Sequence, residues 1–254
     1  MTGRRVAMLV ATTVGCAAAG CAAAGCTATA AGQSSPRNAD STARSGDLRR
    51  AATSALATEP QPTLGDAALV AALKRGGLIL YFRHGSTDWH HLDAKNIVLS
   101  DCSTQRMLAD SGRRQMRDVG TAFTQLHVPV GDVRGSPYCR ILESARLAFG
   151  HVRPDTQLLE VALEPREPKE AHVRWLVGVL ATPPAVPPGT NLVLVGHQDN
   201  LQLATGEMYA GLQLSLREAE GAVFEPDGHG KAVLLARKLP QEWMALASGS
   251  SAPH

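Results

Sequence analysis

Aromatic residues, net charge and long apolar runs are all scarce in this chain of 254 residues. Phe, Trp and Tyr make up only 4% of it, so the sequence predicts a core built mainly from Leu, Val and Ala. Outside an N-terminal segment that holds Arg4 and Arg5, 23 basic residues balance 23 acidic ones. This neutrality argues against sequence-independent nucleic-acid binding, which needs a basic surface. Any affinity for anions must therefore come from a local cluster of cationic groups.

The first 30 residues have the pattern of a secretory signal peptide. Arg4 and Arg5 precede a short apolar run at residues 6–14, and small residues follow it as far as residues 28–30, which suit a signal-peptidase cut. Ala and Gly dominate the segment, which disfavours a stable membrane-spanning helix. The sequence therefore predicts export to an extracytoplasmic location.

Three cysteines in the same segment resemble the lipid-attachment site of bacterial lipoproteins. Cys16, Cys21 and Cys26 each follow a small residue, but Thr or Ala stands three positions earlier, where the lipobox has Leu. Two destinations stay open: a free periplasmic protein, or a protein held on a bacterial membrane through an N-terminal lipid anchor. No other membrane contact is predicted.

Composition divides the rest of the chain into a linker, a domain and a tail. Residues 31–62 are small and polar and offer little apolar surface to offset the entropy of ordering, so they predict a flexible linker. Residues 63–247 predict one folded domain, and its roughly 185 residues are enough for a single core. Residues 248–254 predict a disordered tail.

Apolar runs alternate with helix-periodic segments along this domain. The alternation predicts an α/β fold, a three-layer α/β/α sandwich whose central sheet is mainly parallel, with the last two strands as an antiparallel edge. Asp110 or Ser111 is expected to cap the second helix. The predicted strands are residues 77–82, 130–136, 191–196, 222–225 and 232–237. The predicted helices are residues 66–75, 108–126, a helix that opens at Pro137, residues 171–181 and a helix that starts at residues 200–205.

Polar clusters follow three of the predicted strands. Arg83 and His84 end the first strand, Arg140 lies shortly after the second, and His197 ends the third. Ligands of open α/β sheets bind beyond the carboxyl ends of strands. Two guanidinium forks match phosphate oxygens, and two imidazoles supply a nucleophile and a further donor. The sequence therefore predicts a pocket for a phosphoryl group.

Four segments, in order and at the expected spacing, resemble the motifs of the histidine phosphatase superfamily. The similarity covers roughly residues 75–240 and is closest to small extracytoplasmic bacterial members of the phosphoglycerate-mutase-like branch. The matching segments are RHGST at residues 83–87 (RHGxT), LADSGRRQM at 108–116 (LTxxGxxQA), SPYCRILESA at 136–145 (SPxxRxxxTA) and VGH at 195–197 ((V/S)(G/S)H). Ser86 departs from the pattern, because mutases and many phosphatases carry Glu there.

The resemblance implies a phosphoglycerate mutase-like fold and a phosphatase mechanism. His84 would attack phosphorus and form a phosphohistidine that water then hydrolyses, while Arg83, Arg140 and His197, with Thr87, would bind the phosphorylated small-molecule substrate. Phosphoryl transfer depends on positioning and charge stabilisation, so this set needs neither a metal nor a cofactor.

The general acid for the leaving oxygen is less clearly marked. The resemblance implies a Glu some way after Arg140, and Glu164 is preferred because Pro165 suggests a loop; Glu160 is an alternative. Asp199 is a third candidate, although Gln198 separates it from His197, whereas the acid-phosphatase branch has Asp directly after the late histidine.

Two features of the domain allow more than one interpretation. Asp88, His90, His91 and Asp93 are interpreted as a polar loop at the mouth of the site rather than as a metal site, because no closed ligand set is evident. Cys102 and Cys139 lie close to motif segments and are predicted to form a disulfide outside the cytoplasm, with two buried thiols as the alternative. Cys139 lacks the C-x5-R spacing of cysteine phosphatases, which argues against a cysteine nucleophile.

Two functions from different classes follow. The first is a metal-independent phosphomonoesterase that works through a phosphohistidine on His84. The second is a non-catalytic exported protein that uses a degenerate pocket of the same kind to bind a phosphorylated ligand or a partner.

Overall fold

The computed structural model of the protein describes residues 59–163 and 166–249. The predicted signal peptide, residues 31–58 of the predicted linker and residues 250–254 of the predicted tail lie outside the described residues. Within the described ranges, no helix is both long enough and apolar enough to cross a membrane.

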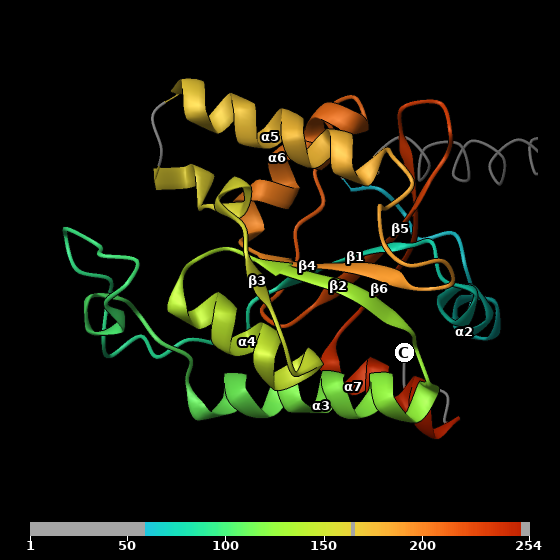
Figure 1. Ribbon diagram of the computed structural model, residues 1–254, viewed down its shortest axis with the longest axis horizontal. Coiled ribbons are helices and arrows are strands. Elements are labelled where there is room, and N and C mark those ends of the chain that lie inside the picture. Colours follow the sequence, from blue (N-terminus) through green and yellow to red (C-terminus); the bar gives the residue numbers. More distant parts are fainter. Residues whose placement is uncertain (1–58, 164–165, 250–254) are drawn as a thin grey trace, which may run out of the picture. The chain divides into compact units, whose positions relative to one another are not determined.

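A six-stranded sheet forms the centre of the domain, in the order β3-β2-β4-β1-β5-β6 (Figure 1). The strands are β1 (Ile79–Arg83), β2 (Val130–Gly135), β3 (Arg153–Pro154), β4 (Asn191–Gly196), β5 (Gly221–Pro226) and β6 (Ala232–Lys238). The first four pair in parallel, whereas β5 is antiparallel to both β1 and β6. The predicted mainly parallel sheet with an antiparallel edge is therefore confirmed.

Helices cover both faces of this sheet. They are α2 (Asp66–Arg75), α3 (Asp110–Leu126), α4 (Cys139–Phe149), α5 (Arg166–Leu180), α6 (Gln198–Met208) and α7 (Pro240–Ser248), with single turns η1 (Cys102–Thr104), η2 (Thr156–Leu158) and η3 (Val161–Leu163). Figure 1 shows α3, α4 and α7 below the sheet and α5 and α6 above it. The three-layer α/β/α architecture is thus confirmed.

Side chains of the central strand β1 alternate between two cores. Phe82 points to the α3 side, whereas Tyr81 points to the α5 side, as the two-residue period of a strand requires. On the α3 side, Phe82, Phe123, Phe149 and Trp243 pack together, with neighbouring ring centroids 5.1–6.1 Å apart, whereas Tyr81 and Phe224 belong to the core on the α5 side. Most of the other buried residues of both cores are Leu, Val and Ala, as the composition predicts.

Several predicted helix boundaries are wrong. The N-cap of α3 is Ala109, which makes no side-chain cap, and Asp110 lies inside the helix and pairs with Arg113 at 3.1 Å. The helix α4 begins at Cys139 and not at Pro137, while α5 and α6 begin before their predicted starts. The helix α7 and the two-residue strand β3 were not predicted at all.

Candidate active site

Pairing within the sheet brings three motif segments to one edge. The strand β4 lies between β1 and β2, with Arg83 opposite Gly196 and Gly135 opposite Val195. The chain after each strand therefore leaves the sheet at the same level. As a result, the His84 and His197 rings lie 6.0 Å apart between centroids.

His84 is held with one ring nitrogen tied to the backbone. Its Nδ1 lies 2.8 Å from the carbonyl oxygen of Gly85, and because that oxygen can only accept, Nδ1 carries the proton. The other nitrogen, Nε2, then has a free lone pair. Burial lowers the pKa of His84 to about 3, and the positive charges of Arg140, Arg83 and Arg106 act in the same direction. The ring is therefore a neutral imidazole at ordinary pH.

Residues of the second and third motifs support the loop that carries His84. Ser144 Oγ accepts the Gly85 amide at 3.1 Å, and Gln115 Oε1 accepts the Ser86 amide at 3.0 Å. Two of the motif positions thus have a direct structural purpose, which is to satisfy backbone donors next to the histidine.

Arg140 is fully buried between two carboxylates. Its Nη1 donates to Asp93 Oδ1 at 3.2 Å and its Nη2 donates to Glu160 Oε2 at 2.8 Å. The guanidinium carbon also lies 4.5 Å from the centre of the Tyr138 ring, which is a cation–π contact. These contacts on both ends fix the plane of the fork.

His197 caps the start of α6 and is equally constrained. Its Nε2 contacts Ser136 Oγ at 3.0 Å, and its carbonyl oxygen accepts the Tyr81 hydroxyl at 2.7 Å. Its Nδ1 lies 3.5 Å from Glu160 Oε2. Burial, followed by the charge of His84 and of nearby arginines, lowers the pKa of His197 well below its ordinary value. A neutral imidazole can donate one hydrogen bond from a fixed position.

Arg83 is oriented by residues that follow His197. Its Nη1 donates to Gln198 Oε1 at 2.6 Å and to the Leu216 carbonyl oxygen at 2.9 Å. The side chain of Gln198, which separates His197 from Asp199, therefore positions the first arginine of the site.

The three candidates for the general acid differ in where they lie relative to the site. Glu164, the preferred one, lies outside the described residues, and Asp199 lies in the first turn of α6. Glu160 is inside the site, in contact with both Arg140 and His197. Burial raises the pKa of Glu160, and the charges of Asp93 and Asp199 add to the increase, although Arg140 opposes it. A carboxyl with a raised pKa can hold a proton for delivery.

The remaining predicted residues lie around this centre. The Thr87 hydroxyl contacts Glu218 Oε1 at 3.5 Å, and the Thr87 backbone bridges to Leu108. His91 is exposed and pairs with Asp88 at 3.0 Å. No group of three or more His, Cys, Asp or Glu side chains among the described residues could hold a metal ion.

Cys102 and Cys139 form a disulfide, with sulfur atoms 2.02 Å apart. Cys139 directly precedes Arg140, so the disulfide joins the start of η1 to the start of the helix that carries this arginine.

The structure places Asp93, Tyr138 and Arg106 in or beside the site. The sequence predicted Asp93 only as part of a polar loop at the mouth of the site, and it predicted no site role for Tyr138 or Arg106. Tyr138 lies within the SPYCR segment and could have been noticed there. Arg106 lies with its guanidinium carbon 3.9 Å from the centre of the Trp89 ring and acts electrostatically on His84. Asp93 and Arg106 belong to a long loop with no periodic pattern, so no sequence signal marked their contacts with the site.

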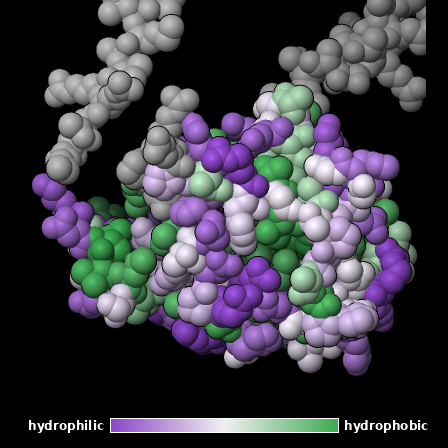
Figure 2. Space-filling model, turned by 45° about the horizontal axis from the view of Figure 1, so that its top comes forward, coloured by the Kyte–Doolittle hydropathy of each residue, from purple (hydrophilic) through white to green (hydrophobic). Residues whose placement is uncertain are grey.

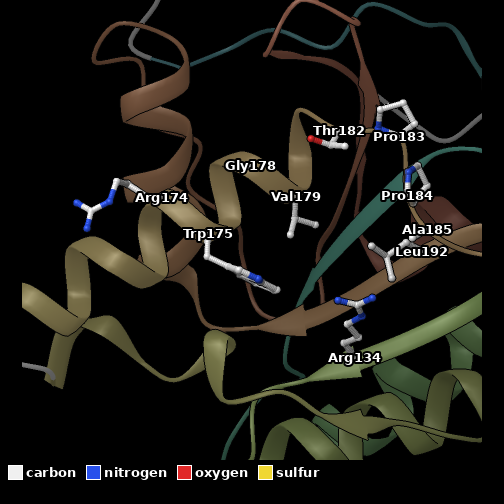
Figure 3. Close-up of a pocket in the computed structure, with 10 residues that line it drawn as sticks. All are labelled: Arg134, Arg174, Trp175, Gly178, Val179, Thr182, Pro183, Pro184, Ala185 and Leu192. Atoms are coloured by element: carbon white, nitrogen blue, oxygen red, sulfur yellow. The ribbon is translucent and has the colours of Figure 1, made fainter.

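A cavity of about 540 Å³ opens next to Arg83, with Ser86, Trp89 and Arg217 among its lining residues. A second cavity of about 470 Å³ lies elsewhere, between the end of α5 and the strands β2 and β4 (Figure 3). None of the residues that line this second cavity was predicted to belong to the site. Figure 2 shows one face of the molecule, where hydrophobic residues form separate patches among hydrophilic ones. The cavity beside Arg83 adjoins the site.

No family model and no curated protein matches the chain. Solved structures do match. The protein histidine phosphatase SixA in complex with tungstate has 16% identity and a TM-score of 0.46, over 65% of this chain and 97% of that one. A phosphoserine phosphatase from Entamoeba histolytica in complex with phosphoserine has 14% identity and a TM-score of 0.46, over 65% and 98% of the two chains. The alpha-ribazole phosphatase from Shigella flexneri has 15% identity and a TM-score of 0.47, over 62% and 94%. The likeness at this identity concerns the fold, and these neighbours are members of the histidine phosphatase superfamily, which the four motifs of this chain resemble.

Proposed function

We propose that this protein is a phosphatase of the histidine phosphatase type, which hydrolyses phosphomonoesters through a phosphohistidine on His84. One observation carries the proposal. A neutral imidazole, with Nδ1 tied to the Gly85 carbonyl, lies buried close to the Arg140 guanidinium and the His197 ring, and the charge of Arg83 acts on it. Such a group is a nucleophile surrounded by donors for phosphoryl oxygens.

The proposed reaction has two steps. The Nε2 lone pair of His84 attacks phosphorus, the P–O ester bond breaks, and the acid gives its proton to the leaving oxygen. Water then attacks the phosphohistidine, the P–N bond breaks, and the resulting carboxylate takes the proton of the water. Arg83, Arg140 and His197 donate to the phosphoryl oxygens throughout.

We assign the acid to Glu160. Its carboxyl group contacts two residues of the phosphoryl site, and burial raises its pKa, which favours the protonated form that the first step needs. Asp199 stays the alternative within the described residues.

The nucleophile is tested with His84→Ala. Purified protein should hydrolyse 4-nitrophenyl phosphate in the presence of a chelator, and acid quenching should trap a covalent phosphoenzyme. His84→Ala should abolish both signals while the circular dichroism spectrum is unchanged. His151→Ala is a matched control, because His151 also contacts a backbone oxygen through Nδ1, at 3.1 Å, but is exposed. Turnover retained in His84→Ala would refute the assignment.

The acid is tested with two leaving groups. 4-Nitrophenolate leaves without a proton, whereas phenolate needs one, so Glu160→Gln should lower kcat/KM about 100-fold with phenyl phosphate and much less with 4-nitrophenyl phosphate. Glu143→Gln is the control, since Glu143 pairs with Arg113 at 2.6 Å and makes no contact with the site. An equal loss with both substrates excludes Glu160 and directs the test to Asp199→Asn and Glu164→Gln.

We also propose an extracytoplasmic location, in the periplasm or on a membrane through an N-terminal lipid anchor. The Cys102–Cys139 disulfide supports it, because disulfides persist in oxidising compartments. The proposed substrate is a phosphorylated small molecule. The alternative, a non-catalytic binding protein, would show phosphate binding without turnover or a trapped phosphoenzyme.

A further inference from the structure

A carboxylate of the loop between β1 and α3 makes direct contact with the site. Asp93 lies in the loop between β1 and α3, 47 positions before Arg140 in the sequence. Its Oδ1 accepts from Arg140 Nη1 at 3.2 Å and from the backbone amide of Arg106 at 2.8 Å. A single oxygen therefore joins the loop to the buried guanidinium.

The first consequence concerns the orientation of Arg140. A fully buried guanidinium needs an opposite charge and filled hydrogen bonds. Here Asp93 supplies a carboxylate at one terminal nitrogen, and an oxygen of Glu160 accepts from the other. Each terminal nitrogen carries two hydrogens, so each keeps one that can bind a phosphoryl oxygen. With Glu160 protonated, removing Asp93 would leave the guanidinium with one hydrogen-bond acceptor and without this opposite charge.

The second consequence concerns the charge around Glu160. This carboxyl group faces Arg140 from α4, His197 from the end of β4 and Asp199 from α6. From the loop it faces Asp93 and Arg106. Burial is the largest cause of its raised pKa, and the negative charge of Asp93 is the larger of the two carboxylate contributions. Asp93 therefore makes it harder for Glu160 to lose its proton.

The loop that carries Asp93 is fastened to the start of α4. Gln105 Oε1 accepts the Cys139 amide at 2.8 Å, and the disulfide joins Cys102 to Cys139. Gln105 Nε2 in turn donates to the Val98 carbonyl at 3.0 Å. The position of Asp93 next to Arg140 is thus supported on the same side of the site by covalent and hydrogen bonds.

We propose that Asp93 is a positioning residue of this site, which holds the Arg140 fork in place and keeps a negative charge beside Glu160, the proposed acid. The inference rests on the proposed phosphatase function and adds the loop between β1 and α3 to the catalytic unit. Asp93 acts through Arg140 and Glu160 and does not itself contact the reacting atoms.

The experiment compares pH profiles of kcat/KM for phenyl phosphate in the full chain and in two variants. Asp93→Asn keeps an oxygen that can accept both hydrogen bonds but removes the charge, so the basic limb should move to lower pH by about one pH unit. Asp93→Ala also removes the hydrogen bonds, so it should lower kcat/KM at every pH. Ionisation of the substrate contributes equally to all profiles and cancels in the comparison.

Asp101→Asn is the matched control. Asp101 lies in the same loop and its carboxylate also accepts a backbone amide, that of Ser103 at 3.0 Å, but this carboxylate contacts Ser103 and not Arg140. Its profile should match that of the unchanged protein. An unmoved basic limb in an active Asp93→Asn protein overturns the role of Asp93 and leaves the proposed function standing. No turnover in the unchanged protein overturns both.

Discussion

At the scale of single residues, two buried neutral imidazoles link stability to pH. The pKa of His84 falls from its ordinary value of 6.5 to about 3 on folding, and that of His197 also falls, in both cases chiefly because of burial. At a pH between the folded and the unfolded pKa of each histidine, the unfolded chain binds a proton that the folded chain does not. The stabilisation is therefore complete above about pH 6.5 and is lost as the pH falls below it.

His84→Asn should weaken this dependence, because the amide does not titrate. Between about pH 7.5 and about pH 5.5, the unchanged protein should lose about 1.4 kcal/mol more of its free energy of unfolding than the variant does. Urea denaturation at the two pH values measures the difference. Equal losses in the two proteins would show that His84 is not held neutral by its surroundings. The comparison is independent of any enzymatic assay, so it tests the environment of His84 without a substrate.

At the scale of elements, the start of α3 touches the loop after β1 with no side chain between them. A Cβ at Gly112 would lie 2.0 Å from the Ser86 carbonyl oxygen, and one at Gly85 would lie 2.6 Å from the Gly112 oxygen. This close contact is what the glycines of the first two motifs provide, and it sets the distance between the helix and His84.

Gly112→Ala should therefore damage both stability and catalysis. The added methyl group must push the Ser86 backbone away, at a cost of about 1–3 kcal/mol. It should also lower kcat/KM at least about tenfold, because small displacements of a nucleophile are costly. Gly178→Ala is the control: it lies within α5 with no heavy atom within 4 Å of the new Cβ, so it should raise stability by about 0.5–1 kcal/mol. Both effects are measured by urea denaturation, together with turnover. A fully stable and active Gly112→Ala protein would contradict the argument.

Local sequence signals were sufficient for the elements whose apolar pattern is continuous. The strand β4 and the helix α2 have the predicted bounds, since each has a run of apolar or helix-spaced residues with clear breaks at both ends. The helix α7 was missed because its core contact, Trp243 against Phe82 and Phe123, comes from tertiary packing and not from a long periodic pattern. The same applies to β3, whose two residues are a strand only through pairing with β2.

At the scale of the whole molecule, the positions of some site residues could be predicted from the sequence, and those of others could not. Arg83, His84 and His197 could be placed together from the sequence because parallel strands end at a common edge. Glu160 and Asp93 reach Arg140 from irregular segments, where neither periodicity nor turn chemistry sets the path of the chain. The pairing of Cys102 with Cys139 could be predicted from the sequence, but not the course of the loop between β1 and α3 that this disulfide fastens to a distant helix.

That disulfide should also contribute substantially to the stability of the domain. It joins positions 37 apart in the sequence, and closing a loop of this length restricts the unfolded chain by about 4 kcal/mol in the chain-entropy treatment. Reduction should therefore lower the free energy of unfolding by an amount of this order, measured by urea denaturation with and without dithiothreitol.

The double variant Cys102→Ser and Cys139→Ser separates loss of the disulfide from other effects of the reductant. The double variant should unfold at a lower urea concentration than the oxidised protein, and this concentration should be the same with and without dithiothreitol. Because the disulfide fastens the loop that carries Asp93, the variant should also lose kcat/KM at urea concentrations where its domain is still folded. Equal stability of the oxidised protein and the double variant would contradict the stabilising role. Full activity in the folded double variant would show instead that the Asp93–Arg140 contact and the Gln105 hydrogen bonds hold the loop without covalent help.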